Sequence, residues 1–166
     1  NVVHFGAALN YPLIAAENDM IGISMTNTPP WMAAPGTGTP SIGTNPMSFA
    51  APAGEKDTFL LDMSTTVVAA AKALREDIDI PEGWLIDNKG ESIREQSKIK
   101  FGETGLLPLG GDPEHGSFKG YGLGIMIEIL TAMLSGVSCG ILHFQNAGRT
   151  GFSSMFGAIN IEAFLP

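Results

Sequence analysis

Apolar and polar residues follow one another along the first part of the chain in blocks that predict one helix and three strands. Residues 7–18 carry apolar side chains at a roughly helical spacing, and the short apolar run at 20–25 predicts a buried strand directly after them. Residues 47–51 and 58–62 predict two more strands, and Pro and Gly at 52–54 predict the turn between them. The first third of the chain therefore predicts alternation of helix and strand.

The remaining apolar runs predict two helices and two further strands. The first helix has Thr65 or Thr66 as a candidate cap, and the second is apolar on nearly all sides, which predicts a buried helix. These elements are expected at residues 67–76 (helix), 84–86 (strand), 121–134 (helix) and 155–161 (strand). Since helices alternate with strands, the fold class is α/β.

Two segments give no periodic signal. Residues 26–44 are rich in Pro, Gly and Thr and predict an irregular loop, and residues 91–117 are polar or Gly-rich. A long irregular loop in a compact protein usually carries function or is disordered. A chain of 166 residues is long enough for one core and short for two, so we expect one domain over residues 1–166.

Charge and composition narrow the classes of partner. The formal net charge is −8 and the nine Lys and Arg residues are scattered, which argues against nucleic acid. The longest apolar stretch, residues 125–134, is interrupted by Glu128 and is shorter than the roughly 20 residues of a membrane span. With no secretory signal visible, we expect a soluble, cytoplasmic protein. Cys139 is the only cysteine, which predicts no internal disulfide.

A dinucleotide fingerprint is the first test for a nicotinamide cofactor. The nearest candidate is Gly120-Tyr121-Gly122-Leu123-Gly124, in which the third glycine comes one residue early and no predicted strand precedes the first. The Rossmann signature is therefore absent. Lys119, beside these glycines and next to the predicted helix, is a plausible anion site for a phosphate or carboxylate. The alternative is a solvated lysine in a loop.

Three other side chains are candidates for chemistry. His4 has a side chain that titrates near neutral pH, which suits general acid–base catalysis, although a packed or surface histidine is the alternative. Asp62 ends a predicted strand, where ligands of open α/β sheets bind, or else it caps the next helix. Arg149 could bind a substrate carboxylate or lie on the surface. No His, Cys or carboxylate spacing indicates a metal site.

A series of short motifs, taken together, resembles the malate/lactate dehydrogenase type-2 family, which includes ureidoglycolate and diketogulonate-type enzymes. The motifs follow the family's order along essentially the whole chain. They are VHFG at 3–6, IGISMTNTPP at 21–30, GTNP at 43–46, LDMS at 61–64, IPEGW at 80–84, LPLGG at 107–111, KGYGL at 119–123 and INIEAF at 159–164.

The resemblance implies a mixed-sheet, non-Rossmann nicotinamide-binding domain, which accounts for the missing fingerprint. It implies that His4 matches an active-site histidine and that the enzyme transfers a hydride between NAD or NADP and a 2-hydroxy acid such as malate or lactate. It also implies a homodimer. The residues that match cofactor contacts of the family are Thr28, Asp62, Met63, Ser64, Lys119 and Gly120.

Two departures from the family pattern shape these expectations. Family members are longer and carry another histidine in an N-terminal Ser-His-Gly motif that this sequence lacks, so we expect the chain to be a fragment. The segment 137–154 also differs from the family pattern, which leaves Arg149 without a family role. The alternative is a non-catalytic dinucleotide-binding fragment, and a structural module without a ligand is the third hypothesis.

Overall fold

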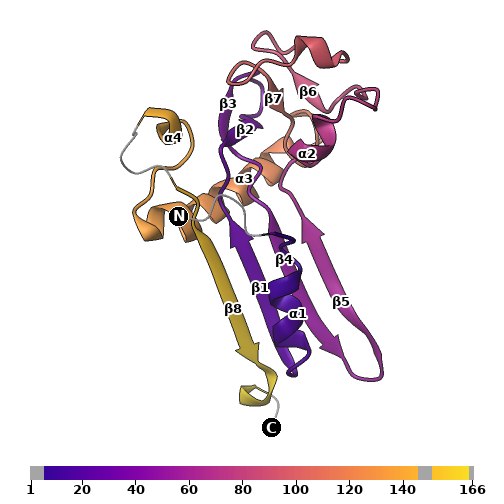
Figure 1. The fold of residues 1–166 in the computed structure, drawn as a ribbon, viewed down its shortest axis with the longest axis vertical. Helices are drawn as coiled ribbons and strands as arrows, with labels where there is room; N and C mark the ends of the chain where they lie inside the picture. Colours follow the sequence, from indigo (N-terminus) through magenta and orange to yellow (C-terminus); the bar gives the residue numbers. More distant parts are fainter. Residues whose placement is uncertain (1–5, 146–150, 165–166) are drawn as a thin grey trace.

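A four-stranded antiparallel sheet forms the long body of the molecule (Figure 1). The computed structural model describes residues 6–145 and 151–164. The strand order is β5-β4-β1-β8. The bounds are β1 Met20–Thr26, β4 Met47–Ala53, β5 Lys56–Met63 and β8 Ser154–Asn160. All four strands were predicted from the sequence, and the structure extends three of them by a few residues while β8 matches closely.

One short helix covers a face of this sheet. Helix α1, Asn10–Ala16, lies within the predicted helical segment and runs along β1 (Figure 1). Gly22 of β1 allows this close approach, because a Cβ atom there would lie 2.4 Å from the carbonyl oxygen of Pro12. The hydroxyl of Ser24 donates to the carbonyl of Ala8 at 2.8 Å, which fixes the start of the helix against the strand.

A second, smaller sheet lies beyond the ends of the long strands (Figure 1). Its order is β3-β2-β7-β6, with β2 and β7 parallel and the other pairs antiparallel. The bounds are β2 Pro30–Ala33, β3 Pro40–Gly43, β6 Leu85–Ile86 and β7 Gly105–Leu106. Together the two sheets confirm the mixed-sheet α/β class.

The prediction of an irregular loop over residues 26–44 was wrong. Strands β2 and β3 lie in this segment, and both begin with a proline, which a strand tolerates at its first residue. Their pairing is irregular in register, so neither shows a clean alternation of apolar and polar residues. Strand β7 was likewise hidden in a segment without periodic signal, because it is only two residues long.

The small sheet is the place where the described residues build a compact apolar cluster. Its members come from the segments after β5 and around β6 and β7, and all are buried. They are Val68, Ala73, Ile80, Leu85, Ile93 and Leu106.

The predicted helix over residues 67–76 is much shorter in the structure. Helix α2 spans Ala70–Ala73, and its N-cap is Ala69 without a side-chain cap. Thr65 and Thr66 do not cap it, since their hydroxyls donate to the carbonyls of Thr44 and Val68. The residues ahead of α2 are thus held by these hydrogen bonds and do not form part of a helix.

The long apolar helix begins earlier than predicted and is only partly buried. Helix α3, Ser117–Glu128, continues into a π-helical turn, Ile129–Met133. Its buried side carries small and polar residues together with Ile127, whereas most of its large apolar side chains face outward. The prediction of a fully buried helix was therefore wrong. The exposed large apolar residues are Phe118, Ile125, Met126, Ile129, Met133 and Leu134.

Short elements complete the described chain. They are a 3-10 turn at Gln96–Lys98, helix α4 at Leu142–Gln145 and a 3-10 turn at Ile161–Ala163. Within residues 6–145 and 151–164, no helix is long and apolar enough to cross a membrane.

Candidate functional site

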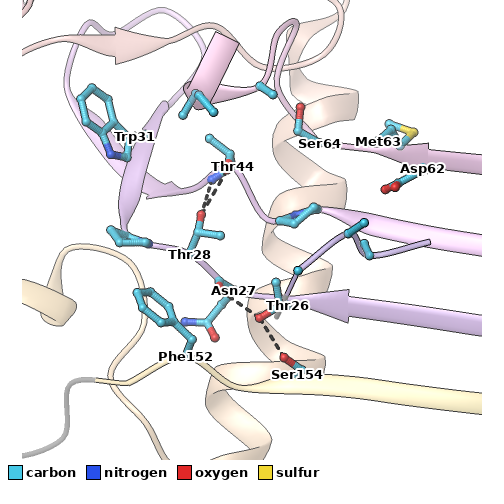
Figure 2. Close-up of a pocket in the computed structure, with 18 residues that line it drawn as sticks. Thr26, Asn27, Thr28, Trp31, Thr44, Asp62, Met63, Ser64, Phe152 and Ser154 are labelled. Atoms are coloured by element: carbon cyan, nitrogen blue, oxygen red, sulfur yellow. Dashed lines mark hydrogen bonds between the residues drawn. The ribbon is translucent and has the colours of Figure 1, made fainter. Parts of the chain in front are cut away.

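A cavity of about 530 Å³ opens where the ends of β1 and β5 meet the small sheet (Figure 2). Segments far apart in the sequence form its wall. The lining residues are Gly6, Ala7, Ala8, Thr26, Asn27, Thr28, Pro29, Trp31, Thr44, Pro46, Asp62, Met63, Ser64, Ala69, Ala70, Ala71, Phe152 and Ser154. The wall therefore combines aromatic and apolar surface with several hydroxyls, one amide and one carboxylate.

Four of the predicted cofactor residues line this cavity together. Thr28 follows the end of β1, whereas Asp62, Met63 and Ser64 lie at the end of β5 (Figure 2). Strands β1 and β5 are not neighbours, since β4 lies between them, and only the sheet brings their ends to one place. The grouping of these four residues was expected from motif resemblance, and the fold now supplies a physical reason for it.

His4 and Arg149 lie outside the described residues. Gly6 and Ala7, which follow His4 closely in the sequence, line the cavity, and Phe152 lines it from the segment after Arg149. The roles of His4 and Arg149 stay predictions.

The Asp62 side chain lies at the cavity and is exposed. The next helix, α2, has no side-chain cap, so Asp62 does not act as its cap. Nearby, the Ser64 hydroxyl donates to the Thr66 carbonyl at 3.3 Å, and its oxygen lies 3.1 Å from the Thr66 hydroxyl oxygen. Asp62 is thus an acceptor open to a ligand, while Ser64 is held by its neighbour.

Two threonines hold the opposite part of the wall. The Thr44 amide donates to the Thr28 hydroxyl oxygen at 2.9 Å, and the two hydroxyls are 3.2 Å apart (Figure 2). The Thr44 carbonyl in turn accepts from both the amide and the hydroxyl of Thr65 at 3.0 Å. These bonds tie the end of β1 to the segment that follows β5.

The start of β8 is tied to the end of β1 in the same manner. The Asn27 side-chain oxygen accepts from the Ser153 amide at 2.8 Å, and the Ser154 hydroxyl donates to the Thr26 hydroxyl at 3.1 Å (Figure 2). Sequence reasoning assigned no role to Asn27, Thr44 or Ser154. Two motifs were available as signals: IGISMTNTPP at residues 21–30 contains Asn27, and GTNP at residues 43–46 contains Thr44.

Lys119 and Gly120 are not among the residues that line this cavity. Lys119 lies inside α3 rather than before it, and its exposed ammonium is 5.8 Å from the ring centre of Phe118. Gly120 packs against the loop before the helix, since a Cβ atom there would lie 2.4 Å from the Leu109 amide nitrogen. The closely spaced glycines at 120–124 are thus part of a helix.

A histidine–carboxylate pair lies on the loop that leads into α3. The His115 Nδ1 atom is 2.7 Å from a carboxylate oxygen of Asp112, and both side chains are exposed. The His115 amide and ring hold the pKa of Asp112 below its usual range. Among the described residues, no three His, Cys, Asp or Glu side chains form a group that could bind a metal.

The two sheets, with a cavity at their junction, define a mixed α/β fold without a dinucleotide fingerprint. The chain belongs to the malate/L-lactate dehydrogenase family, whose model matches residues 1–166. It is 45% identical to a malate dehydrogenase of Pyrococcus abyssi over 172 residues, which cover 100% of this chain and 47% of that protein. It is 38% identical to a ureidoglycolate dehydrogenase (NAD(+)) of Escherichia coli K12, over 82% of this chain and 37% of that protein.

Solved structures show the same fold. A malate dehydrogenase from Entamoeba histolytica superposes with a TM-score of 0.88 at 30% identity, covering 98% of this chain and 48% of that one. The chain thus spans about half the length of the relatives that it matches.

Proposed function

We propose that the whole protein containing this chain is a dehydrogenase that transfers a hydride between NAD or NADP and a 2-hydroxy acid such as malate or lactate. The observation that carries the proposal is the convergence of Thr28, Asp62 and Ser64 on one cavity. Membership of a dehydrogenase family supports the same reaction class. In this proposal, residues 1–166 form the cofactor-binding core.

The cavity fits one end of a nicotinamide cofactor. Its volume of about 530 Å³ lies within the roughly 300–1,000 Å³ of small-molecule sites. The Asp62 carboxylate is an acceptor suited to ribose hydroxyls, while Thr28 and Ser64 add hydroxyl groups. Trp31 and Phe152 offer apolar surface for a ring. Met63 completes the predicted contacts in the cavity, and Lys119 and Gly120 stay proposed cofactor residues at the start of α3.

The chain's own groups position the reactants and move a proton. When bound, the nicotinamide supplies the acceptor for the hydride that leaves the hydroxyl-bearing carbon. We assign to His4 the removal of the hydroxyl proton in oxidation and its return in reduction. The tied threonines Thr28 and Thr44 hold the wall of the pocket in one arrangement, which limits the reorganisation needed when a ligand binds.

An assay of the whole protein tests the proposal. Formation of the reduced nicotinamide is followed by absorbance with malate, lactate and ureidoglycolate, with NAD and NADP in parallel. Asp62→Asn is compared with Asp57→Asn, an exposed aspartate on the same strand that does not line the cavity. We expect Asp62→Asn to raise the KM for the cofactor by roughly tenfold, the effect of losing a charge-assisted acceptor, and Asp57→Asn to leave it unchanged.

The outcomes separate the two candidate functions. Absence of both turnover and cofactor binding in the whole protein would overturn the proposal. Binding of NAD or NADP without turnover of any of the acids would favour the non-catalytic binding module. The homodimer and the cytoplasmic location that the sequence suggests are further predictions, and sedimentation of the purified protein tests the first of them.

A further inference from the structure

The inner side of α3 carries a buried carboxylate where an apolar residue would be expected. Gly120, Gly124 and Glu128 follow one another at a spacing of four, so they share one face of the helix, and all three are buried. Glu128 is only 2% exposed. A buried acid costs free energy unless it is hydrogen-bonded, so its presence here needs a reason.

Glu128 accepts hydrogen bonds from the last residue of β3 and from the loop that follows it. Its Oε1 atom is 3.1 Å from the side-chain nitrogen of Asn45 and 3.4 Å from the Gly43 amide nitrogen. The Oε2 atom has no hydrogen bond among the described residues. Burial raises the pKa of Glu128, and the hydrogen bonds from Asn45 and Gly43, together with the nearby Gly140 amide and His143, act in the opposite direction. A proton on Oε2 would leave Oε1 an acceptor, so the contact with Asn45 survives in either charge state.

Two acceptors fix the orientation of the Asn45 amide. Its nitrogen donates to Glu128 and, at 3.0 Å, to the Gly124 carbonyl. The Asn45 oxygen must therefore face the other way, where it accepts from the Thr28 amide at 2.9 Å. Asn45 is fully buried and has a positive φ of 28°, so the backbone holds it in an uncommon conformation to make these contacts.

Thr28 links Asn45 to the wall of the pocket through hydrogen bonds. Its hydroxyl oxygen accepts from the Thr44 amide, and both threonines line the cavity. The chain of bonds runs from Glu128 through Asn45 to Thr28 and Thr44 without a break. It connects helix α3 to the wall of the cavity.

We propose that Glu128 is a positioning residue of the ligand pocket, which acts through the Asn45 amide to hold Thr28 and Thr44 in place for the cofactor. This inference rests on the proposed function, because it takes the cavity to be the cofactor site. Glu128 itself does not line the cavity. If it only stabilised the fold, its loss would lower stability without a selective effect on ligand binding.

The test compares three replacements of Glu128 in the whole protein. Glu128→Gln keeps an acceptor oxygen for Asn45, Glu128→Leu removes it, and Glu128→Asp withdraws it by one methylene. Ile127→Val serves as the matched control, since Ile127 is buried on the same turn of α3 and its aliphatic side chain cannot accept a hydrogen bond from Asn45. Cofactor dissociation constants for NADH and NADPH are measured by fluorescence titration, together with KM, kcat and the thermal midpoint.

We expect Glu128→Leu to weaken cofactor binding about tenfold, as when a buried donor loses its acceptor, with a smaller change in kcat. Glu128→Gln should restore binding to within about twofold of the wild type. Amide hydrogen exchange at Thr28 should accelerate in Glu128→Leu and not in Glu128→Gln, a readout that does not depend on activity. If Glu128→Leu does not fold, Glu128→Asp should show the same selective weakening.

Distinct results overturn the inference and the proposed function. Wild-type protein that binds neither NADH nor NADPH contradicts the function on which the inference rests. Wild-type binding together with unchanged affinity in Glu128→Leu, or in Glu128→Asp where Glu128→Leu does not fold, overturns the positioning role alone. Equal loss in Glu128→Gln and Glu128→Leu also overturns it, because the acceptor would then not be the group that matters. If Ile127→Val weakens cofactor binding as much as Glu128→Leu does, the weaker binding reflects lost stability, and the positioning role is overturned.

Discussion

The small sheet and the large sheet bury their apolar side chains to different extents. Leu85 and Leu106 of the small sheet are 0% and 1% exposed, whereas Phe59 and Leu61 of the large sheet are 57% and 37% exposed. Alternate residues of β5 share a face, and Phe59 and Leu61 lie on the face away from α1. Within the described residues, the small sheet therefore has its own core, while the large sheet leaves the β5 part of the face away from α1 open.

The two parts of the pocket wall are held in place by different kinds of contact. One part of its wall, at Trp31 and residues 69–71, adjoins the packed apolar cluster of the small sheet. The other part consists of strand ends joined by hydrogen bonds among threonine, serine and asparagine side chains, as at Thr28 and Thr44. Packing holds the first part, and polar contacts hold the second.

The largest expected effect is on the reaction at the pocket where the two sheets meet. In the whole protein, His4→Asn should lower the rate by roughly 10²–10⁴-fold, the usual contribution of one general acid–base group. The pH–rate profile should lose a limb near neutral pH while cofactor binding and the stability of both sheets stay unchanged. His115→Asn, an exposed histidine outside the cavity, is the control. An unaltered rate and pH profile in His4→Asn would leave His4 a packing residue.

The next effect tests the core of the small sheet. Leu106→Ala should lower the free energy of unfolding by about 2–5 kcal/mol, because it leaves a cavity among nearly buried side chains. Urea denaturation measures the loss. A change below about 1 kcal/mol would mean that the small sheet is not the better packed region.

A smaller effect is expected on the cation of α3. Lys119→Ala should weaken cofactor binding by about 1–3 kcal/mol if the lysine contacts an anionic group of the cofactor. Lys72→Ala is the matched control, since Lys72 is another exposed lysine that lies over an aromatic ring, that of Trp84. Isothermal titration with NAD and NADP provides the comparison. Equal affinities for both variants and the wild type would support the solvated-lysine alternative.

The smallest effect is expected on the open face of the large sheet. Phe59→Ser in the 166-residue chain should change the free energy of unfolding by less than about 0.5 kcal/mol, because the ring is already more than half exposed. The same substitution is then made in the whole protein, and its effect on the free energy of unfolding is compared with that of Leu106→Ala. A loss of roughly 1.5–3 kcal/mol there would show that this face becomes covered in the whole protein.

The elements marked by a local pattern in the sequence could be predicted without the structure. Apolar runs of strand length were enough to predict β1, β4, β5 and β8, and the spacing of Gly120, Gly122 and Gly124 was enough to exclude a Rossmann fingerprint. Motif resemblance predicted the family, which the match over the whole chain confirms. Helix α2 was overestimated because the tertiary contacts of Thr65 and Thr66 replaced the local preference for a cap.

Contacts between residues far apart in the chain could be found only in the folded structure. Strands β2 and β3 became visible only through their partners, since neither has a length or pattern that identifies it. Asn45 and Glu128 are 83 positions apart, and nothing in either local sequence predicts that they share a hydrogen bond. The apolar pattern of 121–134 likewise did not reveal which side of α3 would be buried. Such contacts depend on the packing of the sheets against α3, which acts on residues that are close in space and far apart in the chain.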